Sequence, residues 1–461
     1  MRCGKICTVV VESAIGRPGV IRKTAVLLTA VLVCGLGITG TAGAEQNLVR
    51  TDVVVPAAGG DLHGVITAPA GATGLPGVVL IPGSGPSTAD ELRAEAEAFA
   101  RGGIVALTYD KRTDGYSRFR RDYRQLATDA SSALRVLKAR PEIDPARLGL
   151  WGFSEGGWVA PLVAADSPDV SFLITVGASG VSPPRQQAWS YVNFLRYAGI
   201  IGSMVQLMQD TGMRQVVAAG LFPEAGYDPA PVLRRVRVPV LAIWGADDQV
   251  TPVAESMDVF RTKLATGSAT LRVFPDANHR LHKSRNGFTD SAEFAPGYVD
   301  AMTAWVRTLA SGRPSSYADT VPEQNRRTRD LSTPDWYEGT LFQLILGAVL
   351  ALTLLIYLFI PTGLKSSRVL AATGLLGMAG VPLCFYLMVV RGPTGLGPIV
   401  LSRPLLWLAA QVMAITALVC TVFLISVYGR RPPLAKTRLR PIIGTGVALI
   451  IWSAYWGLLL P

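Results

Sequence analysis

The sequence predicts an α/β protein with a doubly wound, mostly parallel sheet, followed by a C-terminal region of four transmembrane helices. Short apolar runs alternate with segments of helical spacing from about residue 51 to residue 310, which is typical of a parallel sheet covered by helices. Residues 341–461 contain long apolar runs and no Asp or Glu. Only 17% of the 461 residues are charged, which is low for an ordinary soluble protein.

The predicted elements of the α/β region follow one another in a regular order. Two β-like runs at 51–56 and 61–68 are joined by a Gly-Gly-Asp turn into a hairpin. Strands and helices then alternate, with strands expected at 77–82, 104–109, 148–151, 172–176, 238–244 and 270–274, and helices at 88–101, 123–139, from about 155, at 253–264 and at 292–310. Such sheets place sites at the carboxyl ends of their strands, so functional residues are expected directly after each strand.

Composition divides the rest of the chain into a leader, a linker and a membrane region. Residues 1–44 have basic residues, an apolar stretch and a final Ala-Gly-Ala, which is the order of a secretory signal peptide; an uncleaved N-terminal anchor is the alternative. The α/β domain is expected at 45–310, and residues of about 181–236 interrupt it between two strands. Residues 311–340 are rich in Ser, Pro, Thr, Arg and Asp and are expected to form an exposed linker.

Four apolar runs in 341–461 are each long enough to cross a bilayer, and they lie at 341–360, 369–390, 405–428 and 441–460. If the leader exports the domain, the loops 361–368 and 429–440 are cytoplasmic and hold seven basic residues, whereas the outer loop holds two. This distribution agrees with the positive-inside rule. We therefore expect a multi-pass protein of the cell membrane with an extracytoplasmic domain. The spans contain no ionisable groups of the kind that line ion pathways, which favours an anchor or a surface for a membrane protein partner.

Charge and cysteine content exclude several other classes. Nine of the 44 Lys and Arg residues lie in 341–461, which leaves 35 basic against 33 acidic residues in the rest of the chain. The net charge of +11 therefore comes from the apolar region, and a nucleic-acid-binding domain is not expected. Residues 45–340 contain no cysteine, so a disulfide framework and a C-x-x-C metal site are excluded there. No metal cluster or phosphate loop is visible, and no cofactor is expected.

A G-x-S-x-G motif follows one predicted strand and precedes a predicted helix, in the run Gly152-Phe-Ser154-Glu155-Gly156. A nucleophile on such a sharp turn needs neighbours without side chains, and the turn lifts the hydroxyl clear of the sheet. The motif predicts Ser154 as a nucleophile.

A nucleophilic serine needs a base and an orienting carboxylate. The chain has three histidines, and His279 directly follows the last predicted strand, with His282 as the second candidate and His63 in the hairpin far from this edge. Asp248 or Asp247 follows strand 238–244 and can face the histidine. The order of serine, aspartate and histidine along the chain differs from that of chymotrypsin and subtilisin.

The oxyanion hole is expected to combine two backbone amides. One belongs to Glu155, the residue after the nucleophile, and the other to Ser84 in the loop Pro82-Gly-Ser-Gly-Pro86. Glycines in that loop allow N–H groups to point at developing charge.

These pieces, together with Tyr109-Asp-Lys-Arg112 and Gly245-Ala-Asp-Asp248-Gln-Val-Thr-Pro252, resemble the α/β-hydrolase superfamily over about residues 50–310. Within it the chain looks like bacterial esterases and serine-aminopeptidase-like hydrolases related to dienelactone hydrolase. The resemblance implies Ser154 as nucleophile, Asp248 rather than Asp247 as acid, and His279 as base. One departure is Thr113-Asp-Gly-Tyr-Ser117, where relatives usually have a second glycine, and this leaves the shape of that loop open.

Relatives place a helical cap where 181–236 interrupt the core, so its apolar residues could line a pocket for a small-molecule or lipid-like acyl substrate. Arg185 or Arg196 could bind a carboxylate there or lie in solvent. The sequence thus predicts a membrane-anchored serine hydrolase, most like a carboxylesterase, with peptidase or acyltransferase activity as variants. The alternative is a non-catalytic sensor or scaffold on a membrane module.

Overall fold

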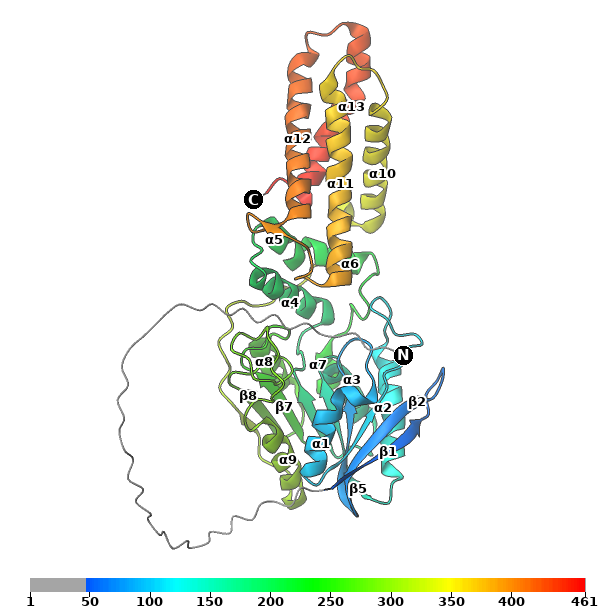
Figure 1. Ribbon diagram of the computed structural model, residues 1–461, viewed down its shortest axis with the longest axis vertical. Helices are drawn as coiled ribbons and strands as arrows, with labels where there is room; N and C mark the ends of the chain where they lie inside the picture. The colour runs from blue at the N-terminus through cyan, green and yellow to red at the C-terminus, as the bar shows by residue number, and fades with distance from the viewer. Residues whose placement is uncertain (1–46, 461) are drawn as a thin grey trace, which may run out of the picture. The chain divides into compact units, whose positions relative to one another are not determined.

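The structure is a computed structural model that describes residues 47–460 (Figure 1). The predicted signal peptide or anchor at 1–44 lies outside these residues. A nine-stranded sheet has the order β1-β2-β4-β3-β5-β6-β7-β8-β9. Its strands are β1 (Leu48–Val55), β2 (Leu62–Pro69), β3 (Leu75–Ile81), β4 (Val105–Tyr109), β5 (Ile143–Phe153), β6 (Phe172–Val176), β7 (Val240–Gly245), β8 (Ala269–Phe274) and β9 (Tyr317–Ala318).

The sheet is parallel except at one edge, as the sequence predicts. β1 pairs with β2 and β2 with β4 in antiparallel register, whereas all pairs from β4 to β9 are parallel. Every residue of β4, β6 and β7 is buried, because helices cover both faces. The carboxyl ends of the parallel strands therefore meet at one edge.

Two layers of helices cover the sheet (Figure 1). Alternate residues of β3 show the division, because Val78 and Leu80 belong to one apolar core and Val79 and Ile81 to the other. One layer consists of α1 (Arg93–Arg101) and α9 (Tyr298–Thr308), and the other of α2 (Tyr123–Lys138), α3 (Gly156–Asp166) and α8 (Val253–Lys263). The helix predicted at 292–310 begins only at Tyr298, because the preceding residues form a loop.

Four short helices lie between β6 and β7, where the cap is predicted. They are α4 (Pro183–Tyr197), α5 (Ser203–Gln209), α6 (Thr211–Ala218) and α7 (Pro229–Leu233). Val192, Leu195, Met204 and Met208 are buried in one apolar cluster with C-terminal helices rather than in either core of the sheet. We call α4, α5 and α6 the cap.

The C-terminal region contains α10 (Thr340–Tyr357), α11 (Lys365–Arg391), α12 (Leu405–Tyr428) and α13 (Pro433–Tyr455). We call these four helices the bundle. Its helices pack closely through small residues, since a Cβ added at Gly380 would lie 2.7 Å from that of Ala410.

Three of the bundle helices, α10, α11 and α12, are long and apolar enough to cross a membrane. The prediction of a fourth such helix at 441–460 is not matched in α13. That helix begins at Pro433, so its first two turns carry Lys436, Arg438 and Arg440, and it ends at Tyr455. Its apolar part is therefore shorter than the run of apolar residues in the sequence.

The segment predicted as a linker follows the domain surface. It adds β9 beside β8, and further along Thr328 N donates a hydrogen bond to Glu255 Oε1 of α8 at 2.7 Å. Arg326 Nη2 donates to the carbonyl of Trp189 in α4 at 2.7 Å. At the end of the segment the buried Glu338 carboxylate accepts from Arg214 of α6 at 2.8 Å.

Candidate active site

Ser154 occupies the turn between β5 and α3. Its φ of +53° lies in the left-handed region, which is rare for a residue with a side chain and is common at functional sites. The Ser154 amide donates to Val176 O at 2.9 Å, which fixes the turn to the end of β6. The hydroxyl is thus presented at the carboxyl edge of the sheet.

The glycines of the motif are required by close backbone approaches. A Cβ at Gly152 would lie 2.2 Å from the carbonyl oxygen of Gly156, and a Cβ at Gly156 would lie 2.3 Å from that of Ile81. Both distances are far below van der Waals contact, and backbone atoms cannot rotate away. The turn therefore forms only with glycine at these two positions.

The structure brings Ser154, His279 and Asp248 together from three different loops. His279 Nε2 lies 2.9 Å from Ser154 Oγ, and His279 Nδ1 lies 2.8 Å from Asp248 Oδ2. The other carboxylate oxygen of Asp248 accepts hydrogen bonds from the amides of Val250 and Thr251, both at 2.7 Å. The Asp248 side chain is completely buried, so these bonds fix its orientation and that of the imidazole.

The competing candidates lie elsewhere. The imidazole of His282 packs against Phe294, and burial lowers its pKa below the usual value. Burial and the charge of Asp276 raise the pKa of Asp247. His63 lies on β2 beside Asp52, at 3.2 Å. Of the three histidines, His279 is the one within hydrogen-bonding distance of Ser154.

The loop predicted to form the second arm of an oxyanion hole approaches Ser154 closely. A Cβ at Gly83 would lie 3.3 Å from Ser154 Cβ. Among the hydrogen bonds of residues 47–460, none has the amide of Ser84 or Glu155 as donor. Both amides are therefore available to a ligand.

The side chain of Glu155 forms a buried ionic network that the sequence analysis did not predict. Its carboxylate accepts hydrogen bonds from Lys111 Nζ at 2.9 Å, Tyr116 Oη at 2.8 Å and Arg121 Nη1 at 2.7 Å. The Glu155 side chain is only 1% exposed. Burial lowers the pKa of Lys111, and burial followed by the Glu155 charge raises the pKa of Tyr116.

The same network holds the loop that contains Ser84. Lys111 Nζ also donates to Gly83 O, and the Gly85 amide donates to Tyr116 Oη at 2.9 Å. One buried carboxylate thus connects the two arms of the expected oxyanion hole. In the sequence, this network could have been sought only from the Tyr109-Asp-Lys-Arg112 run and from the loop 113–117 that follows it, where relatives usually have a second glycine.

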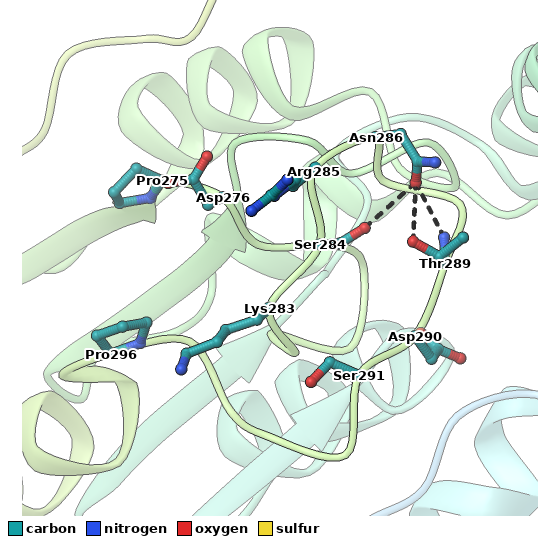
Figure 2. A pocket seen from close by; sticks show the side chains of 10 residues that line it. All are labelled: Pro275, Asp276, Lys283, Ser284, Arg285, Asn286, Thr289, Asp290, Ser291 and Pro296. Carbon is teal, nitrogen blue, oxygen red and sulfur yellow. Dashed lines mark hydrogen bonds between the residues drawn. The ribbon is translucent and has the colours of Figure 1, made fainter. Parts of the chain in front are cut away.

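The loop that carries His279 also forms an open surface hollow of about 760 Å³ (Figure 2). Asn286 Oδ1 accepts hydrogen bonds from the amide and the hydroxyl of Thr289, both at 3.1 Å, and so shapes its rim. Ser154, Asp248 and His279 are not among the residues that line it. This hollow is therefore separate from the triad.

Arg185, considered above as a carboxylate ligand, has partners within the protein. Its guanidinium binds Glu255 of α8 at 3.1 Å and Asp330 at 2.5 Å. It therefore fastens the segment after α9 to the cap and to α8.

Several known proteins are similar to this chain. Residues 93–303 match the prolyl oligopeptidase family. The chain is similar to Esterase EstD of Thermotoga maritima, with 26% identity over 263 residues that cover 52% of this chain and 62% of the relative. It is also similar to a putative carboxymethylenebutenolidase of Methylorubrum extorquens, with 27% identity over 40% of this chain and 48% of the relative.

The chain spans less than two thirds of the length of each of these curated relatives. Among solved structures, a dienelactone hydrolase from Anabaena variabilis has 20% identity and a TM-score of 0.38, and covers 57% of this chain and 98% of its own. The sheet order, the turn at Ser154 and the family match agree with one another. The chain therefore contains a domain with the α/β-hydrolase fold, which matches the prolyl oligopeptidase family over residues 93–303 and is similar to known esterases.

Proposed function

We propose that the protein is a membrane-anchored, extracytoplasmic serine hydrolase that works through an acyl-enzyme. The observation that carries this proposal is the continuous chain of contacts from Ser154 Oγ through His279 to Asp248, at 2.9 and 2.8 Å. Nucleophile, base and orienting acid in this geometry are the arrangement required for acyl transfer.

Each group has one task in the proposed reaction. Ser154 Oγ attacks the carbonyl carbon while His279 Nε2 takes the hydroxyl proton, and the oxyanion is stabilised by the amides of Glu155 and Ser84. The tetrahedral intermediate collapses as His279 returns the proton to the leaving group. Water then attacks the acyl-enzyme with His279 as base, which releases the acid and regenerates Ser154. Asp248 holds the imidazole tautomer and stabilises its positive charge.

The membrane part of the proposal rests on the apolar helices and on the basic loops. α10, α11 and α12 are long and apolar enough to span, and α13 packs beside them as a proposed fourth crossing. Seven basic residues lie in or beside the two connections that join α10 to α11 and α12 to α13, against two near the connection of α11 to α12. This distribution supports a cytoplasmic position for the first two connections and an external position for the hydrolase domain. The leader supports the same orientation.

The bond that is cleaved can be an ester, a thioester or an amide. Besides Esterase EstD, the similar proteins include a thiohydrolase from Arthrinium phaeospermum and a polyketide transferase from Penicillium crustosum. Transfer of the acyl group to an acceptor other than water is therefore a variant of the proposed chemistry. A non-catalytic scaffold is the competing function. The intact contacts around Ser154 favour the enzyme.

Labelling of the detergent-solubilised protein with a fluorophosphonate tests the proposal. We expect covalent labelling of the wild type that disappears in Ser154→Ala and in His279→Ala. A folded wild-type protein that does not react would contradict the hydrolase and favour the scaffold.

A further inference from the structure

A small cavity lies between the cap and the outer end of α11. Its volume is about 100 Å³, and its wall is apolar where α5, α6 and α11 meet. The lining includes Met208 of α5, Met213 of α6, and Phe385 and Met388 of α11. Unbranched methionine side chains adapt to ligands of different shape. The wall of this cavity thus combines hydrolase-domain residues with residues of a helix apolar enough to cross a membrane.

Polar residues also line the cavity, and one of them contacts the buried network of Glu155. Arg121 lines it, and the Nη1 atom of the same side chain donates to Glu155, the residue after Ser154, at 2.7 Å. Arg121 Nε is buried and has no hydrogen-bond partner among the described residues. A buried donor without a partner is costly, and a ligand oxygen at this position would satisfy it.

Helix α4 connects the cavity with the triad. Tyr191 and Gln187 on one side of the helix line the cavity. Asn193 Nδ2 of the same helix donates to the carbonyl of Gln249 at 3.1 Å, in the loop that carries Asp248. The helix therefore contacts the loop of the acid and also forms part of the wall of the cavity.

The position along α11 indicates where the cavity meets the membrane. Phe385, Met388 and Val389 lie in the last two turns of the helix, next to the predicted outer loop at 391–404. Their neighbours Tyr386 and Val390 are 62% and 51% exposed, on the side that would contact lipid. In the proposed topology the cavity therefore lies at the level of the outer bilayer surface.

We propose that the substrate is a lipid-like ester whose acyl chain enters this cavity from the outer surface of the membrane, with its polar head toward Arg121 and its carbonyl at Ser154. This inference rests on the proposed hydrolase and specifies its substrate class. The cavity has room for only a few methylene groups, so a preference for chains longer than acetyl and a limit on chain length are both expected. Burial of two to three methylenes would raise kcat/KM about 10-fold or more.

The test compares two adjacent valines of α11 in the full-length protein, reconstituted in lipid nanodiscs. Val389→Trp fills the cavity, whereas Val390→Trp adds the same side chain to the exposed face. Hydrolysis of p-nitrophenyl acetate, butyrate, hexanoate and octanoate is measured for both variants and the wild type. We expect Val389→Trp to reduce the hexanoate-to-acetate ratio of kcat/KM about 10-fold, whereas Val390→Trp should leave both this ratio and acetate hydrolysis at the wild-type level.

The outcomes separate the two proposals. An unchanged ratio in Val389→Trp, with normal acetate hydrolysis, would overturn the cavity as the acyl site. A wild-type protein that hydrolyses none of the four esters would instead contradict the proposed function. If Val389→Trp does not fold, Val216→Trp on the α6 side of the cavity replaces it and must lower the same ratio.

Discussion

The sheet and the cap belong to one domain by sequence, but they are packed into different cores. The strands bury their side chains between the two helical layers of the domain, in cores that include Trp151 and Trp244. The cap instead shares its core with the bundle, and polar contacts reinforce this, since Gln215 of α6 donates to Tyr455 Oη of α13 at 2.7 Å. The candidate catalytic groups are thus fixed by the sheet, whereas the cap residues proposed to admit substrate are fixed by the bundle.

This difference predicts that substitutions on the two sides have two different kinds of effect. Changes on the sheet side should affect the chemical step or the folding of the hydrolase domain. Changes on the cap side should affect the proposed entry of substrate and the stability of the bundle. The following predictions are ordered from the largest expected effect to the smallest.

The largest effect is expected at the triad, on the sheet side. Ser154→Ala or His279→Ala should lower kcat by about 10⁴-fold or more, because the nucleophile and the base act as one unit. The thermal midpoint of the bundle should not move. Ester hydrolysis and thermal unfolding of the purified protein measure the two quantities, and residual activity above one tenth of wild type would show that another residue is the nucleophile.

The second prediction compares two glycines, Gly152 beside the sheet and Gly380 in the bundle. Gly152→Ala forces a Cβ to within 2.2 Å of a carbonyl oxygen in the nucleophile turn, whereas at Gly380 the nearest atom is the Ala410 side chain at 2.7 Å. The turn cannot relax, but two helices can separate slightly. We expect Gly152→Ala to lower the stability of the hydrolase domain by about 3 kcal/mol or more, as severe strain does.

Gly380→Ala should lower the stability of the bundle by about 1–2 kcal/mol. Limited proteolysis at rising temperature, read separately for fragments of the two regions, measures both changes. A larger loss of stability in Gly380→Ala than in Gly152→Ala would contradict the inference that the turn at Ser154 is more rigid than the packing of the bundle helices.

Two buried carboxylates provide a matched pair for a third prediction. Glu155 binds Lys111 and Arg121 on the sheet side, and Glu338 binds Arg214 on the cap side. Removing one partner of a buried ion pair leaves an uncompensated charge, which typically costs about 3 kcal/mol. We expect Glu155→Gln to lower kcat for every ester, because both arms of the oxyanion hole lose their support.

The same substitution at Glu338 should leave kcat for acetate unchanged and raise KM for long-chain esters. Steady-state kinetics with acetate and hexanoate distinguish the two results. Equal changes in kcat for both variants would show that the two networks are coupled, and the comparison would fail.

The smallest effect concerns pH. Burial lowers the pKa of His282 in the folded protein, so between its ordinary value of 6.5 and the folded value the unfolded chain binds more protons. Stability from this group is therefore complete above pH 6.5 and decreases as pH falls below it. Because His282 is only partly buried, we expect a change of less than about 1 kcal/mol between pH 7 and pH 5.

Replacement of His282 by Gln should flatten this part of the pH profile of thermal stability. Replacement of the half-exposed His63 by Gln is the control for the loss of an imidazole elsewhere in the domain. Parallel profiles for wild type and His282→Gln would contradict the prediction.

Local patterns in the sequence predicted most of the sheet and the residues around Ser154. The run Leu148–Trp151 is a strand in the structure, although β5 extends further on both sides, and the glycines around Ser154 match the close approaches found there. His279 and Asp248 could be expected because each directly follows a strand of the same sheet edge. The choice of Asp248 over Asp247 came from family resemblance, and the hydrogen bond to His279 involves Asp248.

Long-range pairings could not be predicted in this way. Glu155 meets Lys111 and Arg121 only because two loops converge in space, and neither spacing nor periodicity encodes this. Apolar spacing indicated that cap residues such as Leu195 are buried, but not that they are buried against the bundle. Hydropathy alone also overestimated the apolar length of the last helix, α13, because it does not show where a helix begins and ends.

The shared core of cap and bundle has a consequence for biosynthesis. The ribosome makes the cap well before the helices against which Leu195 and Met208 are packed. During that interval the strands on either side can assemble, but the apolar face of the cap has no partner and must be shielded. Folding of the cap therefore depends on the packing of the C-terminal helices, and a version truncated after residue 339 should fold its sheet yet aggregate through the cap.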